Sequence, residues 1–172
     1  MQALRFAAAL VAVVLAHLAG TWLAADFPRA VDLFVVLVVA NARRGSTLSG
    51  LLGGMAAGLT HDVLSGGPYG LYGIADTILG YVTARAAQRV IVERASMVML
   101  VVAAATLVQQ AILMALLLTL MEQPEPPAPL WWAIRAAASG LVALAVELSA
   151  GALRRRRERR RTDRVERLRF PR

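Results

Sequence analysis

The side chains that could do chemistry in this chain gather in the stretch GLTHDVLSGGPYGLYG, residues 58–73, and just beyond it. Two carboxylates, Asp62 and Asp76, with His61 beside the first, could relay protons or a cation, or hold a metal ion. Asp62 could instead accept hydrogen bonds from backbone amides of the following turn or of the next helix, whose dipole favours an anion. We favour hydrogen bonding over transport, and transport over catalysis, because a relay needs polar groups spread across the membrane.

Sequence motifs of known enzyme classes do not occur in the chain. It contains no phosphate loop, no H-E-x-x-H pair and no G-x-S-x-G elbow. The aspartate spacing of CDP-alcohol phosphotransferases is also missing. His61 and Asp62 are neighbours on a helix and point about 100° apart, which suits neither a shared metal nor a base with an orienting partner. With no cysteine either, we expect no catalytic residue, no metal and no cofactor.

The elements that must position these side chains are predicted to be membrane helices. Of the 172 residues, 58% are hydrophobic and only 17% are charged. The runs Phe6–Ala25 and Ala95–Met121 carry no formal charge, and about 20 apolar residues suffice to cross the hydrocarbon core. The first run is also longer than the apolar part of a cleavable signal peptide. The sequence therefore predicts an all-α polytopic membrane protein.

Apolar segments joined by short connections predict a bundle of six transmembrane helices. Pro28 suits the first turn of the second helix, although Asp32 interrupts that segment. Arginines collect at alternate connections and in the tail, so the excess of basic residues in cytoplasmic loops predicts that both termini are cytoplasmic, N-in/C-in. The expected spans are about 4–24, 28–42, 46–64, 71–87, 95–121 and 130–153, followed by a basic cytoplasmic tail at 154–172.

The charge of the chain is concentrated in this tail. Residues 154–172 contain eleven arginines and three acids, which equals the whole formal net charge of +8. A basic segment directly after an apolar helix is typical of an orientation anchor that contacts anionic phospholipids, rather than of a nucleic-acid site. We expect lipid contact, and no nucleic acid, at Arg154, Arg155, Arg156 and Arg157.

Small residues recur every four positions along the third expected span. Positions four apart lie above one another on a helix, and small side chains at this spacing let membrane helices approach closely. A weaker series, Ala8, Ala12, Ala16 and Gly20, marks the first span. Packing within the bundle is the favoured explanation, and self-association into a homo-oligomer stays open. The third-span series is Ser46, Gly50, Gly54, Gly58, Asp62, Gly66 and Gly70, and the fourth span adds Gly73, Asp76, Gly80 and Ala84.

Isolated polar residues in the other spans are expected to be structural. We expect His17 to be a hydrogen-bonded interior residue, and Gln109 and Gln110 to join helices through their side-chain amides. Glu147 should pair with an arginine or a buried donor, and Arg135 should extend along its helix to the outer surface. Together they predict a polar seam that suits a partner site or a small cavity.

Residues 32–85 carry a distinctive series of motifs. An aspartate opens the second span (DLFVVLVVANARRG), a glycine-stepped third span follows, and the fourth span ends LGYVTAR. The most specific part is G-L-x-x-D-x-x-S-G-x-x-x-G at residues 58–70. In these features the chain resembles the rod shape-determining protein MreD family. The resemblance implies packing and interface roles, without chemistry, for Asp32, Gly50, Gly54, Gly58, Asp62, Ser65, Gly66, Gly70, Asp76 and Gly80.

The resemblance implies a non-enzymatic component of the bacterial cell-elongation machinery in the cytoplasmic (inner) membrane. Such proteins pair with MreC, a single-span protein with a periplasmic domain. Through it they are joined to the glycosyltransferase RodA, the elongation transpeptidase and the MreB cytoskeleton. The implied function is a scaffold that supports peptidoglycan synthesis, and with it the cell wall and cell shape.

A second function stays open at this point. The MreD fold is similar to that of the S-components of energy-coupling-factor transporters, which bind vitamins and dock a coupling subunit through small residues on the first span. Ala8, Ala12 and Ala16 would suit such docking. This alternative, a substrate-binding module of a small-molecule transporter, implies a ligand pocket near the outer face, where the candidate lining residues are Tyr69, Tyr72, Trp131, Trp132 and Arg135.

Overall fold

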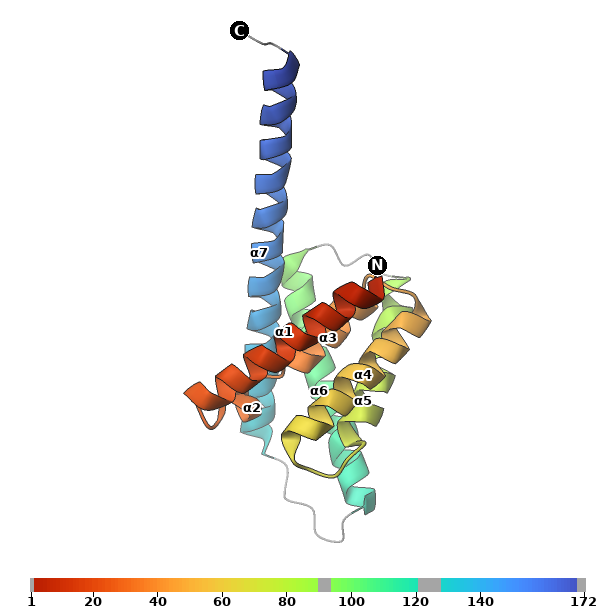
Figure 1. Cartoon of the computed structure of the whole chain (residues 1–172). Helices are drawn as coiled ribbons and strands as arrows, with labels where there is room; N and C mark the ends of the chain where they lie inside the picture. Colours follow the sequence, from red (N-terminus) through yellow and green to blue (C-terminus); the bar gives the residue numbers. More distant parts are fainter. Residues whose placement is uncertain (1, 90–93, 121–127, 170–172) are drawn as a thin grey trace.

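The computed structural model describes residues 2–89, 94–120 and 128–169. For residues 154–169 it describes the backbone, together with one side chain, that of Arg155. Within these ranges the chain forms helices joined by turns (Figure 1). The helices are α1 (Gln2–Leu23), α2 (Phe27–Ala30), α3 (Leu33–Ala42), α4 (Thr47–Ser65), α5 (Leu71–Ala87), α6 (Ala95–Leu120) and α7 (Pro129–Arg169).

The described helices include three that are long and apolar enough to cross a membrane. These are α1, α6 and the part of α7 from Pro129 to Leu153. The all-α class predicted from the sequence is confirmed for the described residues, and several apolar helices in one chain are typical of a multi-pass membrane protein.

The segment expected as one helix from 28 to 42 is broken in two. α2 ends at Ala30, Val31 and Asp32 are extended, and α3 begins at Leu33. The break follows from the capping chemistry of Asp32, whose side chain accepts hydrogen bonds from the backbone N–H groups of Phe34 and Val35, 3.0 Å each. An aspartate in this role satisfies amides that lack a partner at a helix start. Pro28 therefore belongs to α2, and Asp32 opens the longer helix.

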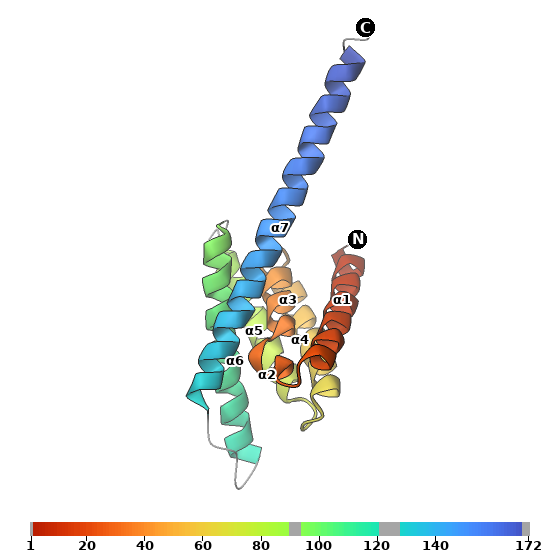
Figure 2. The ribbon, with the colours of Figure 1, turned by 90° about the vertical axis from the view of Figure 1, so that its left-hand side faces the viewer.

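α3 forms the centre of the bundle (Figure 2). Its ten residues reach about 15 Å, half of a hydrocarbon core. Phe34 and Val38 pack against α1 and Ala57, and Val35 and Val39 pack against residues of α5, α6 and α7. These four side chains have no exposed surface. A helix that is apolar on every side is buried on every side, so α3 is the element around which the longer helices pack.

α4 and α5 form an antiparallel hairpin whose backbones almost touch. A methyl group added at Gly50 would lie 2.5 Å from the carbonyl oxygen of Gly80. A methyl group at Gly54 or Gly58 would overlap the carbonyl oxygens of Asp76 or Tyr72. The four-residue series on α4 thus packs directly on the backbone of α5, as the spacing predicted.

The turn between these helices depends on two glycines with positive φ. Gly66 ends α4 at φ +66°, and Gly70 precedes α5 at φ +96°. We expected packing and interface roles for both. A Cβ at either position would meet nothing within 4 Å, so neither glycine packs closely within the described chain, and the interface role stays a prediction. Their requirement is the left-handed backbone, which L side chains adopt only at a cost.

α1 and α7 lie at the edges of the bundle. In α1 the residue that is buried is His17, whereas Ala8, Ala12 and Ala16 are exposed. Ala8, Ala12 and Ala16 therefore lie on the outer side of α1, whereas Gly20, the last member of the series, lies against Phe27 of α2. α7 continues as one helix past Leu153 to Arg169 and projects beyond the end of the bundle where the N-terminus lies (Figures 1 and 2).

Candidate functional site

A buried ion pair joins the start of α3 to α7. Arg135 Nη2 lies 2.5 Å from Asp32 Oδ2, and the two side chains are 9% and 0% exposed. The backbone N–H of Asp32 donates to Ser139 Oγ at 2.8 Å. Because Asp32 Oδ1 caps α3, both carboxylate oxygens are engaged. One aspartate therefore starts α3 and also ties it to α7.

Residues spaced four apart on α7 contact the broken segment, α2 and α3, along its whole length. Arg29 lies over the ring of Trp131, with Cζ 4.6 Å from the centroid. Arg135 and Ser139 hold Asp32, and Ala143 packs in the cluster with Val35 and Val39. At the end of α3, Glu147 Oε1 accepts from Arg43 Nη1 at 2.9 Å and lies 3.5 Å from Arg44 Nη2. The contacting α7 residues are Trp131, Arg135, Ser139, Ala143 and Glu147.

Two of these contacts bear on expectations from the sequence. The expected pairing of Glu147 with an arginine is confirmed. The expected extension of Arg135 to the surface was wrong: Arg135 is 7% exposed and points into the bundle. A guanidinium that can reach a buried carboxylate is stabilised more by that partner than by a long path to water. Ser139 was not singled out from the sequence, although the four-residue spacing from Trp131 to Glu147 was a usable signal.

Asp62 joins the end of α4 to the start of α5. Its Oδ2 accepts from the backbone N–H groups of Gly70 at 3.0 Å and Gly73 at 2.9 Å, and its Oδ1 accepts from that of Tyr72 at 2.9 Å. The first amides of a helix lack partners inside it and carry partial positive charge. Asp62, which is 1% exposed, satisfies them from the neighbouring helix. This is the hydrogen bonding that we favoured from the sequence.

Asp76 joins α5 to α6. Gln109 Nε2 donates to Asp76 Oδ1 at 2.6 Å, and neither side chain is exposed. The helix-joining contact expected of Gln109 is thus confirmed, and among the described residues no hydrogen bond of this kind involves Gln110. Asp76 Oδ2 and Gln109 Oε1 have no partner in the described part of the chain. Asp76 therefore keeps one oxygen that could hold a proton, a water molecule or another donor.

Two histidines lie in an aromatic cluster where four helices meet. The ring of His61 stacks on Phe34, with centroids 4.5 Å apart and an interplanar angle of 17°, and lies 3.8 Å from the ring of Tyr72. His17 of α1 lies 5.9 Å from His61. Within the described residues, Nδ1 of neither histidine has a hydrogen-bond partner. The expected interior position of His17 is confirmed, but the hydrogen bond expected of it is not seen among the described residues. The contacts of His61 are those of a packed ring.

The remaining residues singled out from the sequence occupy supporting positions. Ser65 Oγ donates to the carbonyl oxygen of Asp62 at 3.1 Å, and Gly80 lies against the backbone of Gly50. Ser46 caps α4 by accepting from the N–H of Ser49 at 3.2 Å. In the basic tail, Arg155 is exposed, and the side chains of Arg154, Arg156 and Arg157 lie outside the described part.

Most of these contacts join one helix to another. In the described residues, no group of three or more His, Asp or Glu side chains is placed to hold a metal ion. Cavities of about 390 and 460 Å³ lie beside the first turns of α1, and one of about 340 Å³ lies between α5 and α6. The candidate outer-face residues, Tyr69, Tyr72, Trp131, Trp132 and Arg135, line none of these three cavities.

Comparison with known proteins adds one finding. The family described as rod shape-determining protein MreD matches residues 2–125, which is more than half of the chain. Arg135 and Ser139, the α7 partners of Asp32, and Glu147, the α7 partner of Arg43, lie beyond the matched range. No curated protein and no solved structure matches the chain.

Proposed function

Because the chain belongs to the MreD family of rod shape-determining proteins, we propose that it is a non-enzymatic scaffold of the bacterial cell-elongation machinery. In this role it resides in the inner membrane, binds MreC and supports peptidoglycan synthesis and the maintenance of cell shape. Through MreC it is joined to RodA, the elongation transpeptidase and MreB.

The observation that carries the scaffold role is the use of the buried carboxylates. Both oxygens of Asp62 accept hydrogen bonds from the start of the next helix, and Asp32 and Asp76 each use one oxygen to contact another helix. The other oxygen of Asp32 caps α3. A transporter or enzyme of this size needs polar groups directed at a ligand or a path. Here the polar groups hold α3 to α7, α4 to α5 and α5 to α6, which gives a rigid body whose outer helix surfaces are available to partners.

Six membrane crossings with N-in/C-in orientation complete the proposal. The break at Val31–Asp32 still lets α2 and α3 together make one crossing, since irregular backbone is tolerated where it is buried in protein. The N-terminus, the turn after α3 and the projecting end of α7 lie at one end of the bundle, and the α4–α5 turn lies at the other (Figure 1). The first end carries Arg5, Arg43 and Arg44, which supports a cytoplasmic location for it.

The projecting end of α7 supports a second contact with the membrane. The tail adds eleven arginines and three acids to this end of the molecule, and α7 is helical through Arg169. Basic segments beside a membrane helix are attracted to anionic phospholipids. We assign this contact to the start of the tail, Arg154, Arg155, Arg156 and Arg157, because the continuing helix carries the later arginines away from the bundle.

Affinity purification of the tagged full chain from native membranes tests the scaffold role. Co-purification of MreC with the elongation synthases, identified by mass spectrometry, is the expected result. Asp62→Ala should reduce recovery of MreC, whereas Asp26→Ala should not, because Asp26 is exposed and its side chain makes no capping hydrogen bond. Recovery of an ATPase pair with a coupling subunit, in place of MreC, would overturn the proposal and favour a transport module.

A further inference from the structure

The first turns of α1 stand away from α3 and α4. Cavities of about 390 and 460 Å³ lie on either side of a narrow contact, and Gln2, Phe6 and Asn41 line both. Between the two cavities, Gln2 Nε2 of α1 lies 3.4 Å from Ser49 Oγ of α4, and Phe6 packs against the cluster of Phe34 and Val38. This end of α1 therefore contacts the bundle between two spaces that the chain does not fill.

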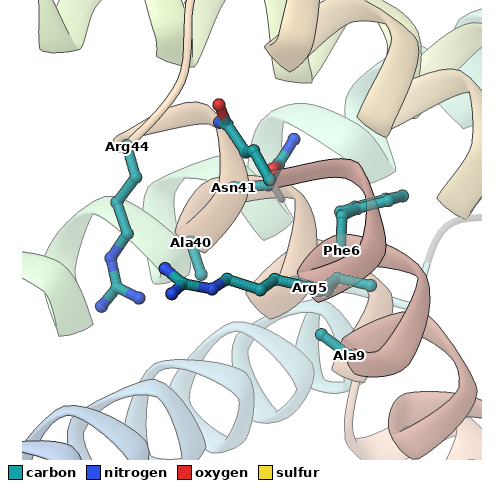
Figure 3. Close-up of a pocket in the computed structure, with 8 residues that line it drawn as sticks. Arg5, Phe6, Ala9, Ala40, Asn41 and Arg44 are labelled. Atoms are coloured by element: carbon teal, nitrogen blue, oxygen red, sulfur yellow. The ribbon is translucent and has the colours of Figure 1, made fainter.

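The first cavity has two chemically different parts. Its apolar lining comes from Phe6, Ala9, Leu37 and Ala40, and its polar lining comes from Gln2, Arg5, Asn41 and Arg44. Figure 3 shows the side chains of Arg5 and Arg44, one from α1 and one from the end of α3, extending toward the same side of the cavity. An apolar cleft with cationic groups at its edge suits an amphiphile with an anionic head.

The charges at this edge are not balanced by the chain. In the described residues no ion pair involves Arg5. Arg44 meets Glu147 at 3.5 Å, but that carboxylate lies closer to Arg43, and the Arg44 side chain is 57% exposed. No acid lines the cavity. Two guanidinium groups that share a cavity repel each other, and each keeps N–H donors that match phosphate oxygens.

We propose that this cavity binds an anionic phospholipid. Arg5 and Arg44 hold the phosphate of the head group, and an acyl chain lies on Phe6, Ala9 and Leu37. The inference rests on the proposed orientation, which places these arginines in the cytoplasmic leaflet. The apolar lining distinguishes the occupant from a free phosphate ion, and the paired arginines distinguish it from an uncharged helix of another protein. This site is separate from the basic tail, which contacts the membrane surface as a whole.

Native mass spectrometry of the purified full chain tests the charged part of the site. With added phosphatidylglycerol we expect one retained lipid, and with phosphatidylcholine a much weaker adduct. Arg5→Gln and Arg44→Gln should each reduce phosphatidylglycerol binding roughly fivefold, the order expected for one basic residue at an anionic head group. The control Arg85→Gln/Arg89→Gln removes two exposed arginines that do not line the cavity. Equal loss in this control would overturn the site in favour of general surface attraction.

A pair of uncharged variants tests the apolar part. Ala9→Phe fills the cavity and should abolish the retained lipid, whereas Ala8→Phe, on the exposed side of the same helix turn, should leave it unchanged. These variants keep every charge, so they test whether the lipid occupies this cavity even if the arginine variants fold poorly. Unchanged binding in Ala9→Phe would overturn the proposal. Competition by inorganic phosphate at equal concentration would also overturn it, since it would indicate a free-anion site. Because no partner protein is present, the result is independent of MreC binding.

Discussion

Asp32 and Arg135 are 103 residues apart in the sequence, and their side chains form a buried ion pair with 2.5 Å between Oδ2 and Nη2. The same aspartate caps α3 with its other oxygen. A short buried helix and a long peripheral one are thus fixed together at a single residue. This arrangement explains how a segment broken at Val31 can remain in the middle of a membrane bundle.

Replacing Asp62 should destabilise the hairpin of α4 and α5. Asp62→Ala leaves the N–H groups of Gly70, Tyr72 and Gly73 without their acceptor, and each unsatisfied buried donor costs about 1–3 kcal/mol. We expect the free energy of unfolding to fall by at least about 2 kcal/mol, measured by thermal unfolding of the purified chain in detergent. The control is Asp26→Ala. Equal unfolding temperatures for the two variants would refute the role.

Alanine at two glycines should have opposite effects. Ala at Gly151, where nothing lies within 4 Å of the added Cβ, should stabilise α7 by up to about 1 kcal/mol, because alanine is the better helix former. Ala at Gly54 would overlap the carbonyl oxygen of Asp76 and should destabilise the chain by about 1–3 kcal/mol. Unfolding of both variants under one condition gives the comparison. A stabilised Gly54→Ala would mean that α4 and α5 do not pack as described.

Replacing Gly70 by alanine should destabilise the chain more than the same replacement at Gly67. Gly70→Ala places an L residue at φ +96° and should lower the free energy of unfolding by about 1–2 kcal/mol. Gly67→Ala is the matched control, since its φ is not positive and its nearest new contact is at 3.8 Å. If the two variants unfold alike, the left-handed turn is not a requirement of the fold.

Replacing Gln109 by leucine should destabilise the chain far more than replacing its neighbour Gln110. Gln109→Leu removes the donor to Asp76 and should cost about 1.5–3 kcal/mol, because the hydrogen bond involves a carboxyl group. Gln110→Leu, at a half-buried position, should change stability by much less. The double variant Asp76→Leu/Gln109→Leu should recover part of the loss, since removing both partners leaves no unsatisfied group. A double variant less stable than Gln109→Leu would indicate a further partner for Asp76.

The parts of the fold that depend on local pattern could be predicted from the sequence. α6 follows from an uncharged segment. The packing of Gly50, Gly54 and Gly58 follows from their spacing, and the contact of Asp62 follows from its position just before a tight turn. Each of these involves residues near one another in the chain.

The partner of Asp32 could not be predicted in this way. Its contact with Arg135 depends on how α3 and α7 pack, and a lone arginine near a helix end is equally compatible with extension to the surface. The break before α3 was a different matter. Asp32 followed by an apolar run is a helix-start signal, and Pro28, four residues earlier, is another. In the structure each signal starts a helix of its own, α2 with Pro28 in its first turn and α3 with Asp32 as its cap.

The measurement that tests the account most directly is a double-mutant cycle on Asp32→Asn and Arg135→Gln, with unfolding of the purified chain as the readout. The asparagine side chain introduced by Asp32→Asn retains an oxygen that can cap α3, so the cycle isolates the contact with α7. Each single variant should lose about 3–5 kcal/mol, because it leaves one buried charge without its partner. The double variant should lose clearly less than the sum of the two, as expected for residues in contact. Losses that add would contradict the claim that this pair holds α3 to α7.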